Sequence, residues 1–247
     1  MKKSRIFITG SADGLGYAAA SNLCAEGHHV VVHVRNPQRL DAVASLLRQG
    51  AQVVTGDLVD LNAVQDIAAQ VNRIGQMDAI IHNAGIYAGP GVVPVNVVAP
   101  YVLTALIAKP SRLIYLSSGM HLNGRPELGN VDWRGERESA SYSDSKLFVT
   151  TLTMALSRRW PEVICSAVDP GWVPTKMGGP SAPDDLRLGH LTQQWLAVSE
   201  DKEALVSGGY WHHQKQRTPH AAAHDAAFQE RLLTRLAQVT GISLPGE

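Results

Sequence analysis

Cysteine is scarce in this chain, which holds only Cys24 and Cys165 among its 247 residues. The two form no Cys-x-x-Cys pair, and each falls in a segment with the pattern of a buried element. Buried cysteines of this kind behave as small apolar residues. Their number and placement favour a reducing compartment, and the expected location is the cytoplasm.

An excess of charge of either sign is also absent, because 22 Lys and Arg residues balance 22 Asp and Glu residues. A chain without net charge has no large electrostatic field to attract nucleic acid or an anionic membrane. The longest apolar stretch, 92–108, is interrupted by Pro94, Asn96 and Pro100 and falls short of the ~20 residues of a membrane span. The first apolar run stops at Thr9, too early for a signal peptide. Small molecules, rather than nucleic acid or membrane, are therefore the expected partners.

Short apolar runs alternate with amphipathic stretches along the chain. The runs are rich in β-branched residues and are followed by turn-forming or polar residues, which is typical of buried strands. Strands that alternate with helices predict a parallel sheet with helices on both faces, and 45% hydrophobic residues supply its core. The predicted fold class is thus α/β, a doubly wound, mostly parallel sheet in a single domain, 1–247. The predicted strands are 6–8, 30–34, 52–55, 77–82, 113–116 and 163–168.

A glycine-rich turn follows the first predicted strand and precedes a helix that ends near Gly27. A strand, a glycine turn and a helix in this order point backbone N–H groups at a phosphate. Gly10 allows a tight turn, Gly14 lets a pyrophosphate approach the backbone, and Gly16 lets the helix lie close to the strand. The spacing differs from the Gly-x-Gly-x-x-Gly of many dinucleotide enzymes, so an ordinary loop is the alternative. The residues assigned to cofactor binding here are Gly10, Ser11, Asp13, Gly14, Leu15 and Gly16.

Polar side chains follow the later predicted strands at the points where these strands end. In parallel sheets, ligands bind at the carboxyl ends of the strands, and these ends share one edge. That edge is therefore the candidate site. Its polar residues are Asp57, Asn83, Ser117, Ser118 and Asp169.

Tyr142 and Lys146 begin a stretch with helical periodicity, which ends near Trp160 because Pro161 follows. Residues four apart share one face of a helix. An ordinary tyrosine has a pKa of about 10, and a lysine ammonium one turn away is expected to lower it by stabilising the phenolate. Such a tyrosine gives a proton to a carbonyl oxygen or takes one from an alcohol. The alternative is a surface tyrosine and a solvated lysine.

Several motifs occur in a fixed order: Thr9-Gly10-x-x-x-Gly14-x-Gly16, Asp57, Asn83-Ala84-Gly85, Asn96, Ser118, Tyr142-x-x-x-Lys146 and Pro170-Gly171. Over nearly the whole chain this order resembles the short-chain dehydrogenase/reductase family, in its single-domain branch with a Rossmann-like fold. The chain looks most like the retinol-dehydrogenase-like members, because of Arg35, the long separation of Ser118 from Tyr142, and the tail that contains Tyr210. The resemblance implies an NAD(P)-dependent oxidoreductase that acts on a small carbonyl or alcohol substrate.

The resemblance assigns catalytic roles to four residues. Tyr142 is the general acid or base, and Lys146 lowers its pKa and binds the nicotinamide ribose. Ser118 hydrogen-bonds the reacting carbonyl oxygen and is preferred to its neighbour Ser117. Asn96 holds a water that links Lys146 to solvent, and a helix-breaking polar residue is the alternative for it.

The resemblance also implies contacts along the cofactor. Asp57 and Leu58 contact the adenine, with a loop cap as the alternative for Asp57. The run Asn83-Ala84-Gly85 supports the sheet and lines the adenosine side. The run Pro170-Gly171 and Thr175 lie over the nicotinamide.

The end of the second predicted strand indicates which cofactor is used. An NAD-specific site places an acid there to bind the ribose 2′-hydroxyl, and that acid repels a 2′-phosphate. Here Val34 occupies the acidic position and Arg35 follows it. An arginine binds a phosphate through charge-assisted hydrogen bonds, so NADP(H) is favoured over NAD(H). A solvated Arg35 that opens a loop is the alternative.

The stretch 172–198 falls where the family places its substrate lid. It combines glycines and prolines with apolar side chains, which predicts a mobile lid with an apolar lining and a hydrophobic substrate. A helix packed on the core without ligand contact is the alternative. The apolar side chains are Trp172, Met177, Leu186, Leu188, Leu191 and Trp195.

The chain departs from the family pattern between Asn83 and Ser118, which lie closer together than usual. The helix predicted there, 95–108, usually forms part of the family's dimer contact, so the homo-oligomer that the family implies is in doubt. An insertion at 122–139 is either a flap or a surface loop. A last helix, 221–238, is predicted to cover the sheet.

The histidines do not predict a metal site, because adjacent pairs share no face and no Glu follows His220 in the zinc-binding pattern with His224. A second function remains open, a nucleotide-sensing or scaffold protein of the same fold without turnover. Such a protein has no need of Ser118, Tyr142 and Lys146 together, so the enzyme is favoured.

Overall fold

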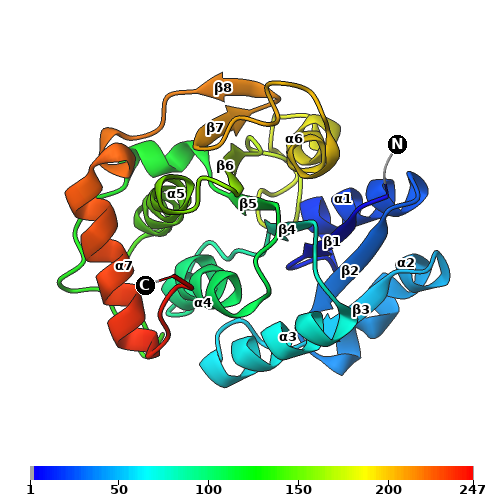
Figure 1. The fold of residues 1–247 in the computed structure, drawn as a ribbon, viewed down its shortest axis with the longest axis horizontal. Helices are drawn as coiled ribbons and strands as arrows, with labels where there is room; N and C mark the ends of the chain where they lie inside the picture. The colour runs from blue at the N-terminus through cyan, green and yellow to red at the C-terminus, as the bar shows by residue number, and fades with distance from the viewer. Residues whose placement is uncertain (1–2, 247) are drawn as a thin grey trace.

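The computed structural model describes residues 3–246, in which eight strands form one sheet in the order β3-β2-β1-β4-β5-β6-β7-β8. Neighbouring strands are parallel except β7 and β8. The predicted α/β class, a doubly wound and mostly parallel sheet in a single domain, is confirmed (Figure 1). The strands are β1 (Arg5–Ile8), β2 (His29–Val34), β3 (Gln52–Thr55), β4 (Ala79–His82), β5 (Arg112–Leu116), β6 (Ile164–Asp169), β7 (Gly209–His212) and β8 (Lys215–Arg217).

Helices cover both faces of this sheet. On one face α1, α2 and α6 pack over the strands, and on the other face α3, α4 and α5 do so (Figure 1). The bounds of these helices are α1 (Gly14–Ala25), α2 (Ala44–Arg48), α3 (Leu61–Ile74), α4 (Ala99–Leu106), α5 (Tyr142–Arg159) and α6 (Leu186–Val198).

The alternation of side chains along β1 explains the two layers. Ile6 and Ile8 are fully buried in the core shared with α1, whereas Phe7 is fully buried in the core shared with α3 and α5. Successive side chains of a strand point to opposite faces, so one short apolar run supplies both cores. Since β1 lies between β2 and β4, the chain leaves it where the strand order reverses, which is where such sheets bind ligands.

Some predicted elements differ in detail from the structure. Between β2 and β3 the chain forms a 3-10 helix, Pro37–Val43, which leads into the short helix α2. The helix predicted at 95–108 begins with a π-helical turn, Pro94–Val98, and continues as α4. A short antiparallel strand, β8, was not predicted.

The prediction that the last helix covers the sheet is wrong. This helix, α7 (Ala226–Thr240), lies outside α5 and contacts it rather than the strands (Figure 1). The ring of Phe228 lies 6.2 Å from the ring of Phe148 on α5. Because α5 already occupies that face of the sheet, α7 forms an outer layer.

The insertion at 122–139 is anchored in its middle. Trp133 is buried and its ring stacks 6.0 Å from that of Phe148. A loop fixed in this way is not free to swing as a whole. No helix within residues 3–246 combines the length and the apolar character needed to cross a membrane.

Candidate active site

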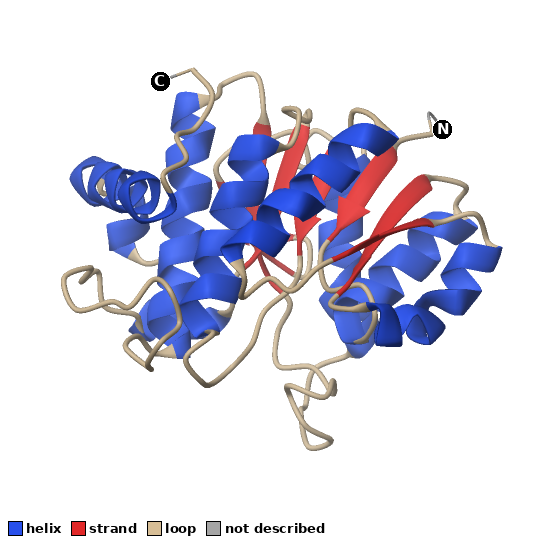
Figure 2. Cartoon of the chain, turned by 90° about the horizontal axis from the view of Figure 1, so that it is seen from below, coloured by secondary structure: helices blue, strands red, loops and turns tan. Residues whose placement is uncertain are grey.

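The carboxyl ends of the parallel strands carry long loops, which gather at the edge of the molecule opposite the two termini (Figure 2). A cavity of about 830 Å³ opens at this edge. The predicted site residues that line it are Gly10, Asp13, Gly14, Leu15, Arg35, Asp57, Leu58, Asn83, Ala84, Gly85, Tyr142, Lys146, Pro170 and Thr175. Those outside the lining are Ser11, Gly16, Asn96, Ser118 and Gly171.

The glycine turn leaves no room for side chains on its inner side. A Cβ at Gly16 would lie 2.3 Å from Nδ2 of Asn83, and one at Gly10 would lie 3.0 Å from Cα of Ala84. Asn83 Nδ2 donates to the carbonyl oxygens of Thr9 and Gly10 at 2.9 and 3.2 Å. The amide of Asn83 therefore fills the space that Gly16 leaves, and it fastens the end of β4 to the turn.

A buried histidine that the sequence analysis missed supports the same turn. His33 on β2 accepts a hydrogen bond from the Gly10 amide through Nδ1 at 3.1 Å, and its Nε2 donates to the Gly56 carbonyl oxygen at 2.8 Å. Burial lowers the pKa of His33, which keeps the ring neutral at physiological pH. Ser11 is buried and bonds inward to the Ile8 carbonyl and the His33 amide. A lone polar residue within an apolar strand was the available sign of His33.

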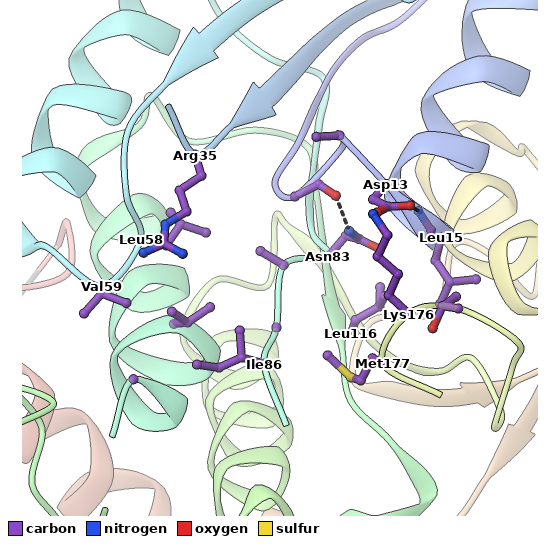
Figure 3. Close-up of a pocket in the computed structure, with 18 of the residues that line it drawn as sticks. Asp13, Leu15, Arg35, Leu58, Val59, Asn83, Ile86, Leu116, Lys176 and Met177 are labelled. Atoms are coloured by element: carbon purple, nitrogen blue, oxygen red, sulfur yellow. Dashed lines mark hydrogen bonds and ion pairs between the residues drawn. The ribbon is translucent and has the colours of Figure 1, made fainter. Parts of the chain in front are cut away.

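An ion pair lies at one end of the cavity. Arg35, just after β2, donates from Nε and Nη2 to one carboxylate oxygen of Asp57, both at 2.8 Å. Asp57 also accepts from the amide of Val59 at 3.1 Å, which fixes its loop. The sequence analysis placed both residues at this end but did not predict that they pair. The guanidinium faces the cavity beside Leu58 (Figure 3).

The other end of the cavity holds the tyrosine and the lysine. Ser141 and Asp144 form a capping box, so Tyr142 is the first residue of α5. Lys146 lies one turn later, and its Nζ is 5.4 Å from the centre of the Tyr142 ring. The Tyr142 hydroxyl hydrogen-bonds the side chain of Ser118. Ser117 lines the cavity but bonds Thr150 at 2.6 Å, whereas Ser118 lies outside the lining.

The expected lowering of the Tyr142 pKa is not what the structure gives. Burial raises the pKa of Tyr142 to about 12, although the hydrogen bond from Ser118 opposes this. Lys146 is itself buried, which lowers its pKa to about 8, and its Nζ donates to the Leu116 carbonyl oxygen at 2.6 Å. Desolvation of the phenol therefore outweighs the hydrogen bond from Ser118, and the charge of Asp169 adds to the rise in the Tyr142 pKa.

Asn96 lies in the π-helical turn and connects three segments. Its side chain bonds the backbone amide and carbonyl of Ile86 at 2.9 and 3.0 Å and donates to Oγ of Ser145 at 3.0 Å. A Cβ at Gly85 would lie 3.3 Å from Asn96 Oδ1 and 3.4 Å from Lys146 Nζ. Asn96 thus lies close to Lys146 and holds the loop after β4 against α5.

The stretch predicted as a lid divides into two parts. Residues 172–185 form a loop at the cavity, called here the lid loop, and α6 follows with its inner face packed against α1. Thr175, Lys176 and Met177 of the lid loop line the cavity, and Figure 3 shows Lys176 beside Asp13. Lys176 was not predicted as a site residue, and Met177 was predicted only as part of the apolar lining of the lid.

These features fit a dinucleotide. The inner side of the glycine turn excludes side chains, the cavity runs from Arg35 to Tyr142, and its size is that of an ordinary cofactor site. Arg35 and Asp57 would hold the adenosine end, the glycine turn the phosphates, and Tyr142 and Lys146 the nicotinamide end. Within residues 3–246 no group of three or more His, Cys, Asp or Glu side chains is arranged to hold a metal ion.

Comparison with known proteins decides the family. Residues 4–186 match the family described as short chain dehydrogenase. This chain belongs to the short-chain dehydrogenase/reductase family. It is 38% identical to short-chain dehydrogenase chry4 of Gibberella zeae over 98% of this chain and 99% of that protein. Human retinol dehydrogenase 13 is more distant, at 27% identity over 97% and 85% of the two chains, so the family is shown but the retinol-dehydrogenase-like grouping is not.

Solved structures agree on the fold of this short-chain dehydrogenase/reductase. An uncharacterised protein from Mycobacterium paratuberculosis superposes with a TM-score of 0.81 at 25% identity, over 98% of this chain and 95% of that one. A short-chain dehydrogenase of Shigella flexneri, solved with NADP, gives a TM-score of 0.70 at 20% identity, over 87% and 98% of the two chains. The chain is thus an oxidoreductase of the NAD(P)(H)-dependent type.

Proposed function

We propose that this oxidoreductase uses NADP(H) to interconvert a hydrophobic carbonyl compound and the corresponding alcohol, with Tyr142 as the general acid or base. The observation that carries the proposal is that Tyr142 and Lys146 line one end of a cavity whose other end holds Arg35, with Ser118 beside the Tyr142 hydroxyl. When bound, the nicotinamide cofactor supplies a hydride for reduction or accepts one in oxidation.

The side chains divide the proton chemistry among them. With a pKa raised to about 12, Tyr142 carries its proton at neutral pH and is ready to donate it to a carbonyl oxygen. Ser118 bonds the phenol and can hold the same carbonyl oxygen beside it. Lys146, with a pKa lowered to about 8, keeps its ammonium at neutral pH and can bind the ribose hydroxyls. Asn96 is a positioning residue, because it holds the loop of Gly85 against α5.

The adenosine end supports NADP(H). Asp57 engages Nε and Nη2 of Arg35 and leaves Nη1 for a 2′-phosphate, and no acid replaces Val34. The NADP bound by the Shigella flexneri relative is in keeping with this choice. Hydrogen bonds to charged groups contribute about 1.5–3 kcal/mol, which corresponds to roughly a ten- to hundredfold preference for the phosphorylated cofactor.

A hydrophobic substrate is supported by exposed apolar side chains in the loops that follow β4, β5 and β6. The Tyr87 ring lies 4.9 Å from the Tyr142 ring and is 54% exposed, and Trp172 in the lid loop is 57% exposed. Met120 and Leu122 follow Ser118 and are exposed as well. These side chains come from three segments that meet at the strand ends, so an apolar substrate has surfaces to contact on several sides.

A monomer in the cytoplasm is the form that we propose for the enzyme. Residues 91–105, which include the helix that usually takes part in the family's dimer contact, are all buried within the single chain. The carbonyl of Ile242 accepts a hydrogen bond from the Tyr101 hydroxyl at 2.7 Å, so the C-terminal segment helps to cover α4.

The test is oxidation of NADPH, followed by nicotinamide absorbance, with a panel of apolar, charged and sugar carbonyl compounds. We expect turnover of apolar aldehydes or ketones. Tight NADPH binding without turnover of any compound would favour the sensing or scaffold function instead. Turnover restricted to charged or sugar compounds would contradict the proposed substrate class.

A further inference from the structure

The lid loop is fastened to the glycine turn by an ion pair. The ammonium of Lys176 contacts the carboxylate of Asp13, which is the N-cap of α1 and accepts a hydrogen bond from the Gly14 amide at 2.8 Å. The guanidinium of Arg39 lies 3.9 Å from the same carboxylate. One carboxylate at the start of α1 therefore faces two cations, and these hold its pKa below the ordinary value.

The sign of the Asp13 charge is unfavourable for the ligand that this turn would bind. The phosphates of a dinucleotide are anionic, and a carboxylate beside them repels them. Asp13 lines the cavity next to Gly14 and Leu15, and Lys176 of the lid loop lies beside it (Figure 3). A cation placed at this point offsets the repulsion and offers hydrogen bonds of its own.

The pair is exposed enough to exchange partners. The side chains of Lys176 and Asp13 are 80% and 47% exposed, and exposed ion pairs stabilise a protein by only ~0–1 kcal/mol. An ammonium has three N–H donors, so it can bridge a carboxylate and a phosphate at once.

The lid loop holds Lys176 in place. The methyl group of Thr175 would lie 3.4 Å from a Cβ at Gly14, so the loop contacts the glycine turn directly. The Thr175 carbonyl accepts from the Gly179 amide at 2.8 Å, and the Trp172 indole donates to the Gly178 carbonyl at 2.8 Å. These bonds brace the segment on both sides of Lys176 and present its side chain to the start of α1.

We propose that Lys176 is a ligand of the cofactor's diphosphate, and that it shifts from its contact with Asp13 to a bridge between Asp13 and the diphosphate when the cofactor binds. The inference rests on the proposed function, since it requires that the cavity bind a dinucleotide. It adds a residue that recognises the diphosphate and leaves the 2′-phosphate to Arg35.

Two fragments of the cofactor separate these roles in calorimetric titrations. ADP-ribose carries the diphosphate without a 2′-phosphate, and 2′-AMP carries the 2′-phosphate without a diphosphate. For Lys176→Met we expect about tenfold weaker binding of ADP-ribose, a loss that shrinks in about 0.5 M NaCl, and unchanged binding of 2′-AMP. Lys202→Met, which changes an exposed lysine outside the cavity lining, is the matched control and should bind both fragments normally.

Two further readouts concern the lid loop and the charge of Asp13. ADP-ribose should protect amides of 172–185 from hydrogen exchange in the wild type and less so in Lys176→Met. Asp13→Asn keeps an N-cap oxygen but removes the repelling charge, and it should bind ADP-ribose a few-fold more tightly.

The outcomes separate the two proposals. A wild-type protein that binds neither NADPH nor ADP-ribose would overturn the proposed function. Normal ADP-ribose binding by Lys176→Met, or equal losses for both fragments, would overturn the role of Lys176 and leave the function intact. Weaker ADP-ribose binding by Asp13→Asn would contradict the charge argument.

Discussion

Lys146, at the proposed nicotinamide end of the cavity, is only 4% exposed, whereas the side chain of Arg35, at the proposed adenosine end, is 69% exposed. The buried end has shifted pKa values and hydrogen bonds that join α5 to β5 and to the loop after β4. The exposed end consists of the ion pair between Arg35 and Asp57, on the loops that follow β2 and β3. Burial suits proton chemistry, because low dielectric strengthens every polar contact, and exposure suits the selection and release of a charged cofactor.

The largest expected effect comes from the buried end. Tyr142→Phe removes the proton donor, and general acid catalysis is typically worth ~10²–10⁴-fold, so turnover should fall at least about a hundredfold. NADPH binding should persist, because the ring and its packing remain. Steady-state kinetics and NADPH fluorescence check both points, with Tyr17→Phe on α1 as the control. Near-normal turnover by the Tyr142→Phe variant would refute the role of Tyr142.

The exposed end should give a smaller and salt-sensitive effect. Arg35→Ala should remove most of the roughly ten- to hundredfold preference for NADPH over NADH. The effect of the substitution should be smaller at high salt, because salt screens the charge of Arg35. The dissociation constants of both cofactors measure this, and Arg48→Ala, a surface arginine on α2, is the control. Equal affinities in the wild type would show that the adenosine end does not select NADP(H).

The pH dependence of NADPH binding tests the role of the buried end of the cavity separately from that of the exposed end. Burial lowers the pKa of Lys146 to about 8, so its ammonium is lost as the pH rises through that value. A hydrogen bond from a charged ammonium stabilises a complex more than one from a neutral amine. We therefore expect NADPH to bind about fivefold more weakly at pH 9 than at pH 7. In Lys146→Met the NADPH affinity should not change over this pH range. A wild-type profile as flat as that of the variant would contradict the charged role of Lys146.

Unfolding at high pH would not explain weaker NADPH binding at pH 9, because deprotonation of Lys146 changes the stability of the folded chain in the opposite direction. Between about pH 8 and pH 10.5 the unfolded chain keeps the Lys146 proton that the folded chain has lost, so this group's contribution to stability rises with pH. The raised pKa of Tyr142 acts in the opposite sense, but only from about pH 10 to pH 12. Thermal unfolding across the same pH range tests this.

A substitution in the glycine turn is expected to have an effect of intermediate size on stability. Gly16→Ala would place a Cβ 2.3 Å from Asn83 Nδ2, and overpacking of this kind costs about 1–3 kcal/mol in the free energy of unfolding. Gly129→Ala, whose Cβ would meet nothing within 4 Å, should change it by less than about 0.5 kcal/mol. Urea unfolding distinguishes the two variants, and equal stabilities would show that the turn tolerates a side chain.

The smallest effect concerns assembly. Since residues 91–105 are already buried in one chain, we expect a monomer of 26.6 kDa by size-exclusion chromatography with light scattering. A stable dimer would show that another face has taken the place of α4.

The sequence predicted the parts of the molecule that local patterns encode. The short apolar run around Phe7 indicated a buried strand, and Tyr142 with Lys146 indicated one face of a helix. The contacts between distant segments had no such pattern. Lys176 meets Asp13 from a loop more than 160 positions away, and His33 supports the glycine turn from the next strand. The raised pKa of Tyr142 depends on total burial, which spacing along the chain does not reveal.

Measuring two quantities in the same three proteins tests most directly whether the two ends of the cavity have separate roles. The turnover number at saturating NADPH and the ratio of NADH to NADPH dissociation constants are determined for the wild type, Tyr142→Phe and Arg35→Ala. The account predicts that Tyr142→Phe changes turnover but not the ratio, and that Arg35→Ala changes the ratio but leaves turnover within about twofold. A variant that moves both quantities together would contradict it.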